Sequence, residues 1–201
     1  MTAITSGGQQ RGKETAGGNT VRGRAVGAET MRVLGISGSL QTASSNTVLL
    51  RRAAELAPEG TEVEIYRSLG TLPHFNPDVI DAGELAAVAE LRSLVANADA
   101  VVIATPEFAH GMPGSLKNAV DWMVGTGELY GKPVAVLSAA PSEDRGGHAR
   151  QWTEQTLRAQ GADVRISATV RVHRAGATSR LDDGASAALK DAFDALKHSP
   201  A

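Results

Sequence analysis

The chain has 201 residues, a formal net charge of −2 and an isoelectric point near 6.2. This balance gives no basic field that would attract nucleic acid or an anionic membrane surface. No apolar run approaches the roughly 18 residues that span a bilayer, so we expect a soluble, cytoplasmic protein with no nucleic-acid or membrane partner. The sequence contains no cysteine, which excludes disulfides, thiolate metal sites, iron–sulfur clusters and cysteine nucleophiles.

Residues 1–30 differ in composition from the rest of the chain. They hold seven glycines and no aromatic residue, and they show neither a helical nor a strand period. We expect a disordered leader, followed by one folded domain over residues 31–201. The four basic residues of this segment would also suit a transit peptide, and a start codon chosen upstream of Met31 would produce such a segment too.

Strands and helices alternate from residue 31 onward. Five runs predict strands, and the first, third and fourth are almost entirely apolar, as in strands buried on both faces of a parallel sheet. These strands are expected at 32–37, 62–66, 99–105, 132–138 and 163–168. Helical patterns follow them at 46–57, 84–97, 113–124, 147–160 and 184–198. Five strand–helix units in series indicate one doubly wound α/β domain with three layers.

The segment from Val33 to Ala57 consists of a short apolar run, a loop rich in hydroxyl side chains and a helical pattern. Backbone N–H groups at the start of a helix favour an anion, and the hydroxyl groups between Ser37 and Asn46 add side-chain donors. The loop contains no lysine or arginine, whereas phosphoryl transfer normally requires cations that neutralise the transition state. We therefore expect this loop to hold the phosphate of a bound cofactor. The alternative is a serine-rich turn that only caps the helix.

Neither of two common nucleotide-binding signatures occurs in the chain. The first strand runs into GISGSL, which lacks the GxGxxG fingerprint, and no GxxxxGK string is followed by Ser or Thr. Two other unusual loops follow the third and fourth predicted strands, at 105–113 (TPEFAHGMP) and 138–147 (SAAPSEDRGG). Ligands bind beyond the carboxyl ends of the strands in such a sheet, so the three loops together predict one binding site.

Three stretches of the chain together resemble the NADPH-dependent FMN reductase family, flavodoxin-like flavoproteins that include quinone, chromate and azo reductases. The stretches are GSLQTASSN, ATPEFAHGMPGSLKNAVDW and VAVLSAAPSEDRGGHAR, and the resemblance covers residues 31–170. The second is the most specific, because it matches the family pattern PEYN, PG and LKNAxDW at Pro106, Glu107, Pro113, Gly114, Leu116, Lys117, Asn118, Ala119, Asp121 and Trp122. The resemblance implies a flavodoxin-like sandwich, with a five-stranded parallel sheet in the order 2-1-3-4-5 and helices on both faces.

The resemblance also implies FMN as the cofactor, with its phosphate in the first loop and its ring against the second, and NADPH or NADH as the hydride donor. Hydride transfer to a flavin requires positioning and no acid, base or metal from the protein, so we expect no catalytic side chain and no metal site. The implied cofactor-binding residues are Ser37, Ser39, Gln41, Ser44, Ser45, Asn46, Thr47, Pro106, Glu107, Phe108, Ala109, His110, Ser138 and Ala139.

Several positions depart from the family pattern. Gln41 stands where GSLR has an arginine, which removes the one cation expected near the phosphate. PEYN has become PEFA, so Phe108 lacks a hydroxyl group and Ala109 lacks an amide, and the third loop has SAAPS in place of SxSPG. Loss of one charged hydrogen bond weakens binding by about one to two decades. We expect weaker FMN binding than is usual in the family, unless Arg145 compensates.

Some conspicuous side chains have structural interpretations as well as functional ones. His110 would lie beside the flavin ring, as a donor or only as part of a turn. Glu107 could be mistaken for a general base, but its place in the family motif favours a role in the fold or in a subunit contact. We expect Trp122 and Trp152 to pack in the core or at a dimer interface, since both fall on amphipathic helices.

The expected function is that of a homodimeric or homotetrameric enzyme. It takes hydride from NADPH or NADH onto bound FMN and passes it, by a ping-pong route, to a small-molecule flavin, quinone, azo, nitro or metal-oxide acceptor. Arg145 and Arg150 are candidate partners for the 2′-phosphate of NADPH. The alternative is a non-catalytic FMN-binding or electron-carrier module that serves a partner protein. Aromatic residues make up only 3% of the chain, which leaves few candidates for an aromatic lid over the flavin and favours the reductase.

Overall fold

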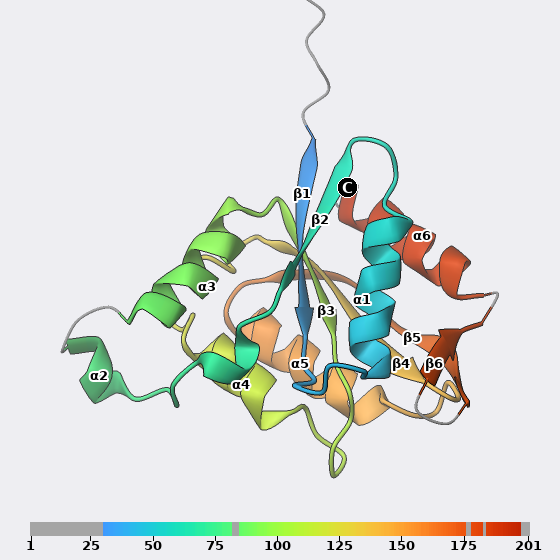
Figure 1. Cartoon of the computed structure of the whole chain (residues 1–201). Helices are drawn as coiled ribbons and strands as arrows, with labels where there is room; N and C mark the ends of the chain where they lie inside the picture. The colour runs from blue at the N-terminus through green and yellow to red at the C-terminus, as the bar shows by residue number, and fades with distance from the viewer. Residues whose placement is uncertain (1–29, 82–84, 176–177, 183, 198–201) are drawn as a thin grey trace, which may run out of the picture.

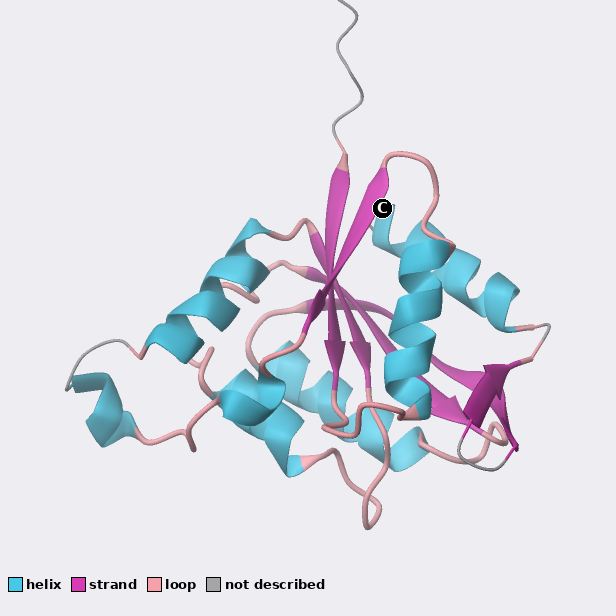
Figure 2. Ribbon diagram, viewed as in Figure 1, coloured by secondary structure: helices cyan, strands magenta, loops and turns pink. Residues whose placement is uncertain are grey.

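The strands and helices of the chain build three layers (Figure 1; Figure 2). A computed structural model describes residues 30–81, 85–175, 178–182 and 184–197, so the predicted leader lies outside the described residues except for Thr30. None of the helices in this described part is both long and apolar enough to cross a bilayer.

The predicted strands and helices are confirmed. Most of their first and last residues lie within a few positions of the predicted ones. The strands are β1 (Met31–Ser37), β2 (Thr61–Tyr66), β3 (Ala100–Ala104), β4 (Pro133–Ala140), β5 (Asp163–Ala175) and β6 (Thr178–Leu181). The helices are α1 (Ser45–Glu55), the 3₁₀-helix η1 (Leu69–Thr71), α2 (Pro77–Asp81), α3 (Ala86–Asn97), α4 (Gly114–Asp121), α5 (Gly147–Ala159) and α6 (Ala185–Lys197). The sequence patterns did not predict η1, α2 or β6.

The sheet has the order β2-β1-β3-β4-β5-β6. The first five strands are parallel, in the order that the family resemblance implied. The prediction of five strands is wrong, because β6 pairs antiparallel with an extended β5 at the edge of the sheet. In that extension Val170 and Val172 are buried while Arg171 and His173 are exposed. Such alternation is typical of a strand covered on one face, and a search for continuous apolar runs ends too early there.

Each buried strand supplies apolar side chains to both faces of the sheet, since successive side chains point in opposite directions. Leu34 and Val101 belong to a cluster with residues of α3, α4 and α5, whereas Val33 and Val102 belong to a cluster with residues of α1 and α6. Figure 1 shows these two sets of helices on opposite sides of the sheet. Because every fully buried Val or Leu side chain contributes about 1.5–3 kcal/mol, these two interfaces hold the layers together.

The LKNAxDW motif fixes the segment between η1 and α2. Trp122 is 3% exposed, donates from Nε1 to the Pro73 carbonyl oxygen at 2.8 Å, and meets the Phe75 ring edge-on at 5.2 Å. Asn118 Oδ1 accepts from the Phe75 amide at 2.7 Å. The core position predicted for Trp122 is confirmed. Trp152 is 55% exposed on α5, so the core position considered for it is wrong.

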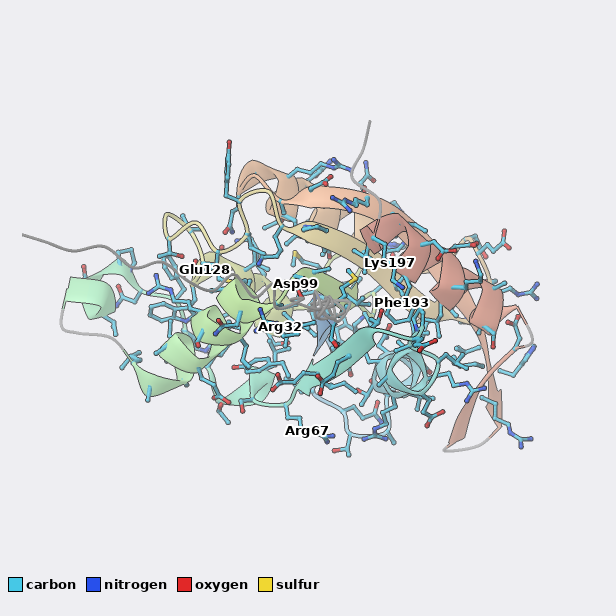
Figure 3. The ribbon with its side chains drawn as sticks, turned by 90° about the horizontal axis from the view of Figure 1, so that it is seen from above. Arg32, Arg67, Asp99, Glu128, Phe193 and Lys197 are labelled. Atoms are coloured by element: carbon cyan, nitrogen blue, oxygen red, sulfur yellow. The ribbon has the colours of Figure 1, made fainter. Side chains whose placement is uncertain are left out.

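Phe193 provides a test of the packing between α6 and the sheet. Its side chain is 1% exposed within the cluster that α1 and α6 share, and Figure 3 labels it on α6. We expect Phe193→Ala to lower the free energy of unfolding by about 3–5 kcal/mol, because the truncation leaves a cavity. Urea denaturation followed by circular dichroism measures this loss. The matched control is Phe108→Ala, at a position 60% exposed, which should change stability by less than about 0.5 kcal/mol; equal losses would contradict the assignment.

Candidate functional site

The loops after β1, β3 and β4 line one cleft of about 620 Å³ at the carboxyl edge of the sheet. All of the predicted cofactor-binding residues except Ser37 and Thr47 line it. The structure thereby brings together three loops that lie far apart in the sequence. The cleft has further lining residues that were not among the predicted cofactor-binding residues, namely Thr105, Ala140, Pro141, Asp144, Arg145, Gly146, His148 and Val172.

Ser37 and Thr47 shape the first loop from behind. Ser44 is the N-cap of α1, and its Oγ accepts from the Thr47 amide at 3.0 Å. Thr47 Oγ1 lies 2.9 Å from Ser44 Oγ and 3.1 Å from Ser37 Oγ. This chain of hydroxyl groups satisfies one of the open donors at the helix start. It also ties the end of β1 to α1, which fixes the part of the loop that faces the cleft.

Asn46 connects the first loop to the third. Its side chain lies in the first turn of α1 and is 3% exposed, and its Oδ1 accepts from the Ala139 amide at 2.9 Å. The carboxamide oxygen is therefore engaged by the chain itself. The bond is partly buried, and a group left unpaired at such a position costs up to about 1–3 kcal/mol, so the contact holds the start of α1 and the end of β4 in a fixed relation.

The tip of the second loop is a tight turn of an unusual composition. Phe108 and Gly111 exchange backbone hydrogen bonds of 3.1 and 3.0 Å, and the two residues between them, Ala109 and His110, have φ angles of 48° and 59°. Positive φ at both central positions is the geometry of a type I′ turn, which favours Asn and Gly. Gly111 lies close to Trp152, since a Cβ there would be 3.4 Å from the indole ring. The loop therefore keeps a strained turn that rests on α5.

Glu107 joins the second loop to the third. Its Oε2 accepts from the backbone amides of His148 and Ala149 at 3.0 and 3.2 Å, at the start of α5. A carboxylate is favourable at a helix N-terminus, because it meets open N–H groups and the positive end of the helix dipole. His110 Nδ1 lies 3.5 Å from Oε1. With its oxygens engaged in this way, Glu107 has the role in the fold that the motif suggested.

The third loop requires a glycine next to the cleft. Gly146 has a φ of 83°, and a Cβ there would lie 2.6 Å from Ser138 Oγ. β4 continues to Ala140, so Ser138 and Ala139 lie in the strand, and the prediction that the strand ends at residue 138 is wrong by two residues. The cause is the extension of β5, which pairs Ser138 with Thr169. The GG dipeptide at 146–147 is the sequence feature that could have indicated a position where the backbone lies close to the Ser138 side chain.

The two arginines considered for the 2′-phosphate of NADPH have different positions. Arg150 is partly buried, and its Nη1 donates to Ser138 Oγ at 2.6 Å and to Thr169 Oγ1 at 2.5 Å. Burial lowers the pKa of the Arg150 guanidinium, and its side chain supports the wall of the cleft without lining it. Arg145 lines the cleft with an exposed side chain. The structure thus leaves Arg145 as the one arginine among the described lining residues of the cleft.

The three loops bring different residue types to the cleft. The first loop and the start of α1 contribute mostly hydroxyl and carboxamide residues. The second and third loops contribute Phe108, two histidines, His110 and His148, whose rings meet edge-on at 5.1 Å, and the charged residues Glu107, Asp144 and Arg145. Within the described residues, no group of three His, Asp or Glu side chains is placed to hold a metal ion. The arrangement suits an organic ligand with a phosphate at one end and a flat ring at the other.

The strained turn leads to a prediction on stability. We expect Ala109→Asn to raise the free energy of unfolding by about 0.5–1 kcal/mol, because Asn tolerates the left-handed region better than Ala. Thermal unfolding of the two proteins measures the change. The matched control is Ala43→Asn, which makes the same substitution at an exposed position outside the turn. If Ala43→Asn stabilised the protein as much as Ala109→Asn, the turn would not be the origin of the effect.

Comparison with known proteins agrees with this geometry. The sequence model of the NADPH-dependent FMN reductase family matches residues 31–176. The NAD(P)H-dependent FMN reductase PA1204 of Pseudomonas aeruginosa is 39% identical over 132 residues, which are 65% of this chain and 71% of that protein. The quinone reductase of Escherichia coli K12 is 33% identical over 133 residues, again 65% of this chain and 71% of that protein.

Solved structures show the same fold. FerB, a flavoenzyme NAD(P)H:(acceptor) oxidoreductase from Paracoccus denitrificans, superposes with a TM-score of 0.69 at 26% identity, covering 83% of this chain and 97% of that chain. The apo form of the NADH:FMN oxidoreductase EMOB gives a TM-score of 0.60 at 21% identity, covering 83% and 88%. The chain therefore belongs to the NADPH-dependent FMN reductase family, and it is an NAD(P)H-dependent oxidoreductase that uses FMN.

Proposed function

We propose that the cleft between the three loops is the FMN site, with the phosphate against the start of α1 and the ring between the second and third loops. The observation that carries this proposal is that the loops line one cleft with different residue types. The first loop supplies Ser39, Ser44 and Ser45, next to the start of α1, and the second loop supplies residues 106–110, with the aromatic rings of Phe108 and His110. This difference matches the two ends of a flavin mononucleotide.

The donors of the first loop and the start of α1 fit a phosphate monoester. The first turn of α1 offers backbone N–H groups that have no partner within the helix. The Ser44 cap and the Asn46 contact hold that turn in place, as the contacts of 3.0 Å to Thr47 and 2.9 Å to Ala139 indicate. Such a site needs no rearrangement when an anion arrives, and a preformed site avoids the entropic cost of ordering a loop.

When bound, FMN supplies the redox chemistry, since its ring accepts a hydride and passes the electrons on. The residues of the chain bind and orient the reactants. Glu107 anchors the second loop to α5 and so presents its backbone rigidly to the ring. Phe108, which is 60% exposed, and the exposed His110 stand at the rim, where a nicotinamide or a small acceptor would approach.

The acceptor that we propose is a quinone or a free flavin, with azo, nitro and metal-oxide compounds as further candidates. The names of the relatives, FMN reductase and quinone reductase, support an acceptor of this class. The two exposed aromatic side chains at the rim, Phe108 and His110, would pack against a flat acceptor. We propose a homodimer or homotetramer that works in the cytoplasm.

An absorption spectrum of the purified protein tests this function directly. We expect a yellow protein, or one that turns yellow with added FMN, whose flavin band bleaches when NADPH or NADH is added under anaerobic conditions. Benzoquinone added afterwards should restore the band. The cleft as the site is tested by Ser45→Glu, at the first residue of α1 and on the cleft wall; an acidic residue in the first turn of a helix is favourable, so this variant should fold, but its charge should repel the FMN phosphate and weaken FMN binding. Wild-type protein that binds no FMN would refute the assignment, and so would undiminished binding by a folded Ser45→Glu.

Gln41 offers a test of the phosphate end. Its side chain is exposed on the wall of the cleft, and its backbone amide is fixed by a 3.3 Å contact to Ser39 Oγ. We expect Gln41→Arg to tighten FMN binding by about tenfold or more, because a charged hydrogen bond contributes about 1.5–3 kcal/mol. Fluorescence titration of the apoprotein with FMN measures it. Thr42→Arg, which adds the same charge outside the cleft, should have a much smaller effect; equal effects would mean that the charge acts only at long range.

A further inference from the structure

A second hollow, of about 340 Å³, lies behind the first loop. Ser39 and Gln41 line both this hollow and the FMN cleft, so the two spaces share a wall. Arg51 of α1 and Arg67, which follows β2, line the second hollow together with Thr42. The same two arginines line the adjoining groove of about 740 Å³ over the edge strand β2. The first loop therefore has two arginines on the side that faces away from the cleft.

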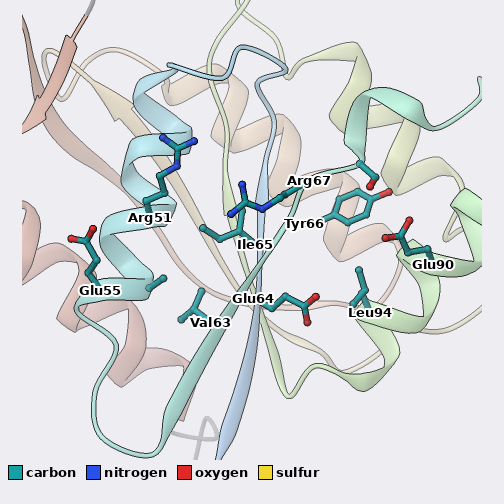
Figure 4. A pocket seen from close by; sticks show the side chains of 11 residues that line it. Arg51, Glu55, Val63, Glu64, Ile65, Tyr66, Arg67, Glu90 and Leu94 are labelled. Atoms are coloured by element: carbon teal, nitrogen blue, oxygen red, sulfur yellow. The ribbon is translucent and has the colours of Figure 1, made fainter.

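The two arginines converge on one space. Figure 4 shows Arg67 extending across β2 toward α1, and Arg51 pointing from α1 toward the first loop, with Ile65 beneath them. Within the described residues, neither guanidinium forms an ion pair. Their neighbour Arg52 is bonded to Glu55 at 2.8 Å. Two cations that share a hollow without a carboxylate create a local positive potential, which an anion would relieve.

The acidic residues of the groove do not neutralise this pair. Glu64 and Glu90 also line the groove over β2, but Figure 4 shows both on the side of α3, away from Arg51 and Arg67. Glu55 is the remaining acid of the groove, and Arg52 already binds it. The end of the groove next to the first loop is therefore basic, although the net charge of the whole chain is −2.

We propose that Arg51 and Arg67 bind the 2′-phosphate of NADPH and give this enzyme a preference for NADPH over NADH. The inference rests on the proposed FMN cleft, because the nicotinamide must reach the flavin while the adenosine lies outside. The 2′-phosphate is a dianionic monoester at the far end of the coenzyme, and guanidinium groups match its geometry with paired hydrogen bonds. NADPH is a long molecule whose 2′-phosphate lies far from its nicotinamide ring. With the nicotinamide at the flavin, a hollow next to the cleft suits the 2′-phosphate better than Arg145 inside the cleft does.

Gln41 has a part in this arrangement. It lies on the shared wall, where the family pattern GSLR places an arginine. With a neutral side chain there, Arg51 and Arg67 are the basic residues among those that line the second hollow. The 2′-phosphate of NADPH would thus bind in the second hollow. The phosphate of FMN would bind to the uncharged hydrogen-bond donors of the cleft.

Calorimetric titration of the FMN-loaded enzyme tests the site with two probes, 2′,5′-ADP and 5′-AMP, which differ only in the 2′-phosphate. We expect wild-type protein to bind 2′,5′-ADP more tightly. Arg51→Gln and Arg67→Gln should each weaken 2′,5′-ADP binding by about tenfold, since each loses a charged hydrogen bond, and should lower the ratio of kcat/KM for NADPH to kcat/KM for NADH by a similar factor. Both side chains are exposed, so the variants should fold, which circular dichroism verifies.

Arg180→Gln is the matched control, because it removes the same charge from an exposed position on β6, at the opposite edge of the sheet from β2, and it should leave both quantities unchanged. Arg145→Gln tests the rival position in the cleft. Equal binding of the two probes by wild-type protein would overturn the inference, as would an equal loss in Arg180→Gln or a loss confined to Arg145→Gln. Failure of the proposed function is distinguishable, because the flavin would then be bleached by neither NADPH nor NADH in wild-type protein.

Discussion

The hydrogen bond from the Ala139 amide to Asn46 Oδ1, 2.9 Å long and partly buried, is the contact on which the geometry of the cleft depends. It joins the first turn of α1 to the end of β4. Because Asn46 is only 3% exposed, loss of the bond would leave its carboxamide oxygen with few other partners, which is costly. With the contacts of Glu107 to the start of α5, it links all three loops. The positions of these loops therefore follow from the sheet order plus two polar side chains.

The distribution of charge around the first loop follows from the same geometry. The loop is fixed by neutral hydroxyl groups and a carboxamide, so it offers a phosphate many donors and little net charge. The cations stand elsewhere, with Arg150 held against Ser138 and Thr169 and with Arg51 and Arg67 on the far side of the loop. The two sides of the loop therefore carry different groups, with hydroxyl residues facing the cleft and two guanidinium groups lining the hollow behind it.

The success of sequence-based prediction depended on the kind of signal. The buried parallel strands were predictable because a short, continuous apolar run such as AVVIA, bounded by polar residues, is typical of a strand buried on both faces. The end of β5 was missed because the search was for continuous apolar runs, which mark strands buried on both faces. The end of β5 is covered on one face only, so its buried residues Val170 and Val172 alternate with exposed ones. The core position considered for Trp152 was wrong, because helical spacing alone does not tell a core face from a face that supports a loop; its place at a dimer interface stays a prediction.

Part of the site could not be predicted because it depends on contacts between distant segments. The three loops were recognisable from composition and from the family motifs, and they do meet in one cleft. However, nothing in the local sequence shows that Asn46 bonds to Ala139, 93 residues away, or that Thr47 turns behind the loop. Arg51 and Arg67 had no motif at all, since each falls within an ordinary pattern of a helix or a strand end. Only the packing of α1 against β2 brings them to one hollow.

The turn at Ala109 and His110 shows how the family site can change its chemistry while it keeps its shape. A left-handed alanine is unfavourable by about 1–2 kcal/mol, and a strained turn persists only where the surroundings determine its conformation. Glu107 fixes one end of the loop on α5, and Gly111 rests on Trp152 at the other. Because these contacts hold the turn, residue 109 is free to lose its amide. In the proposed FMN site, the backbone next to the ring would then keep its place, while the loss of the amide at Ala109 would make the rim less polar.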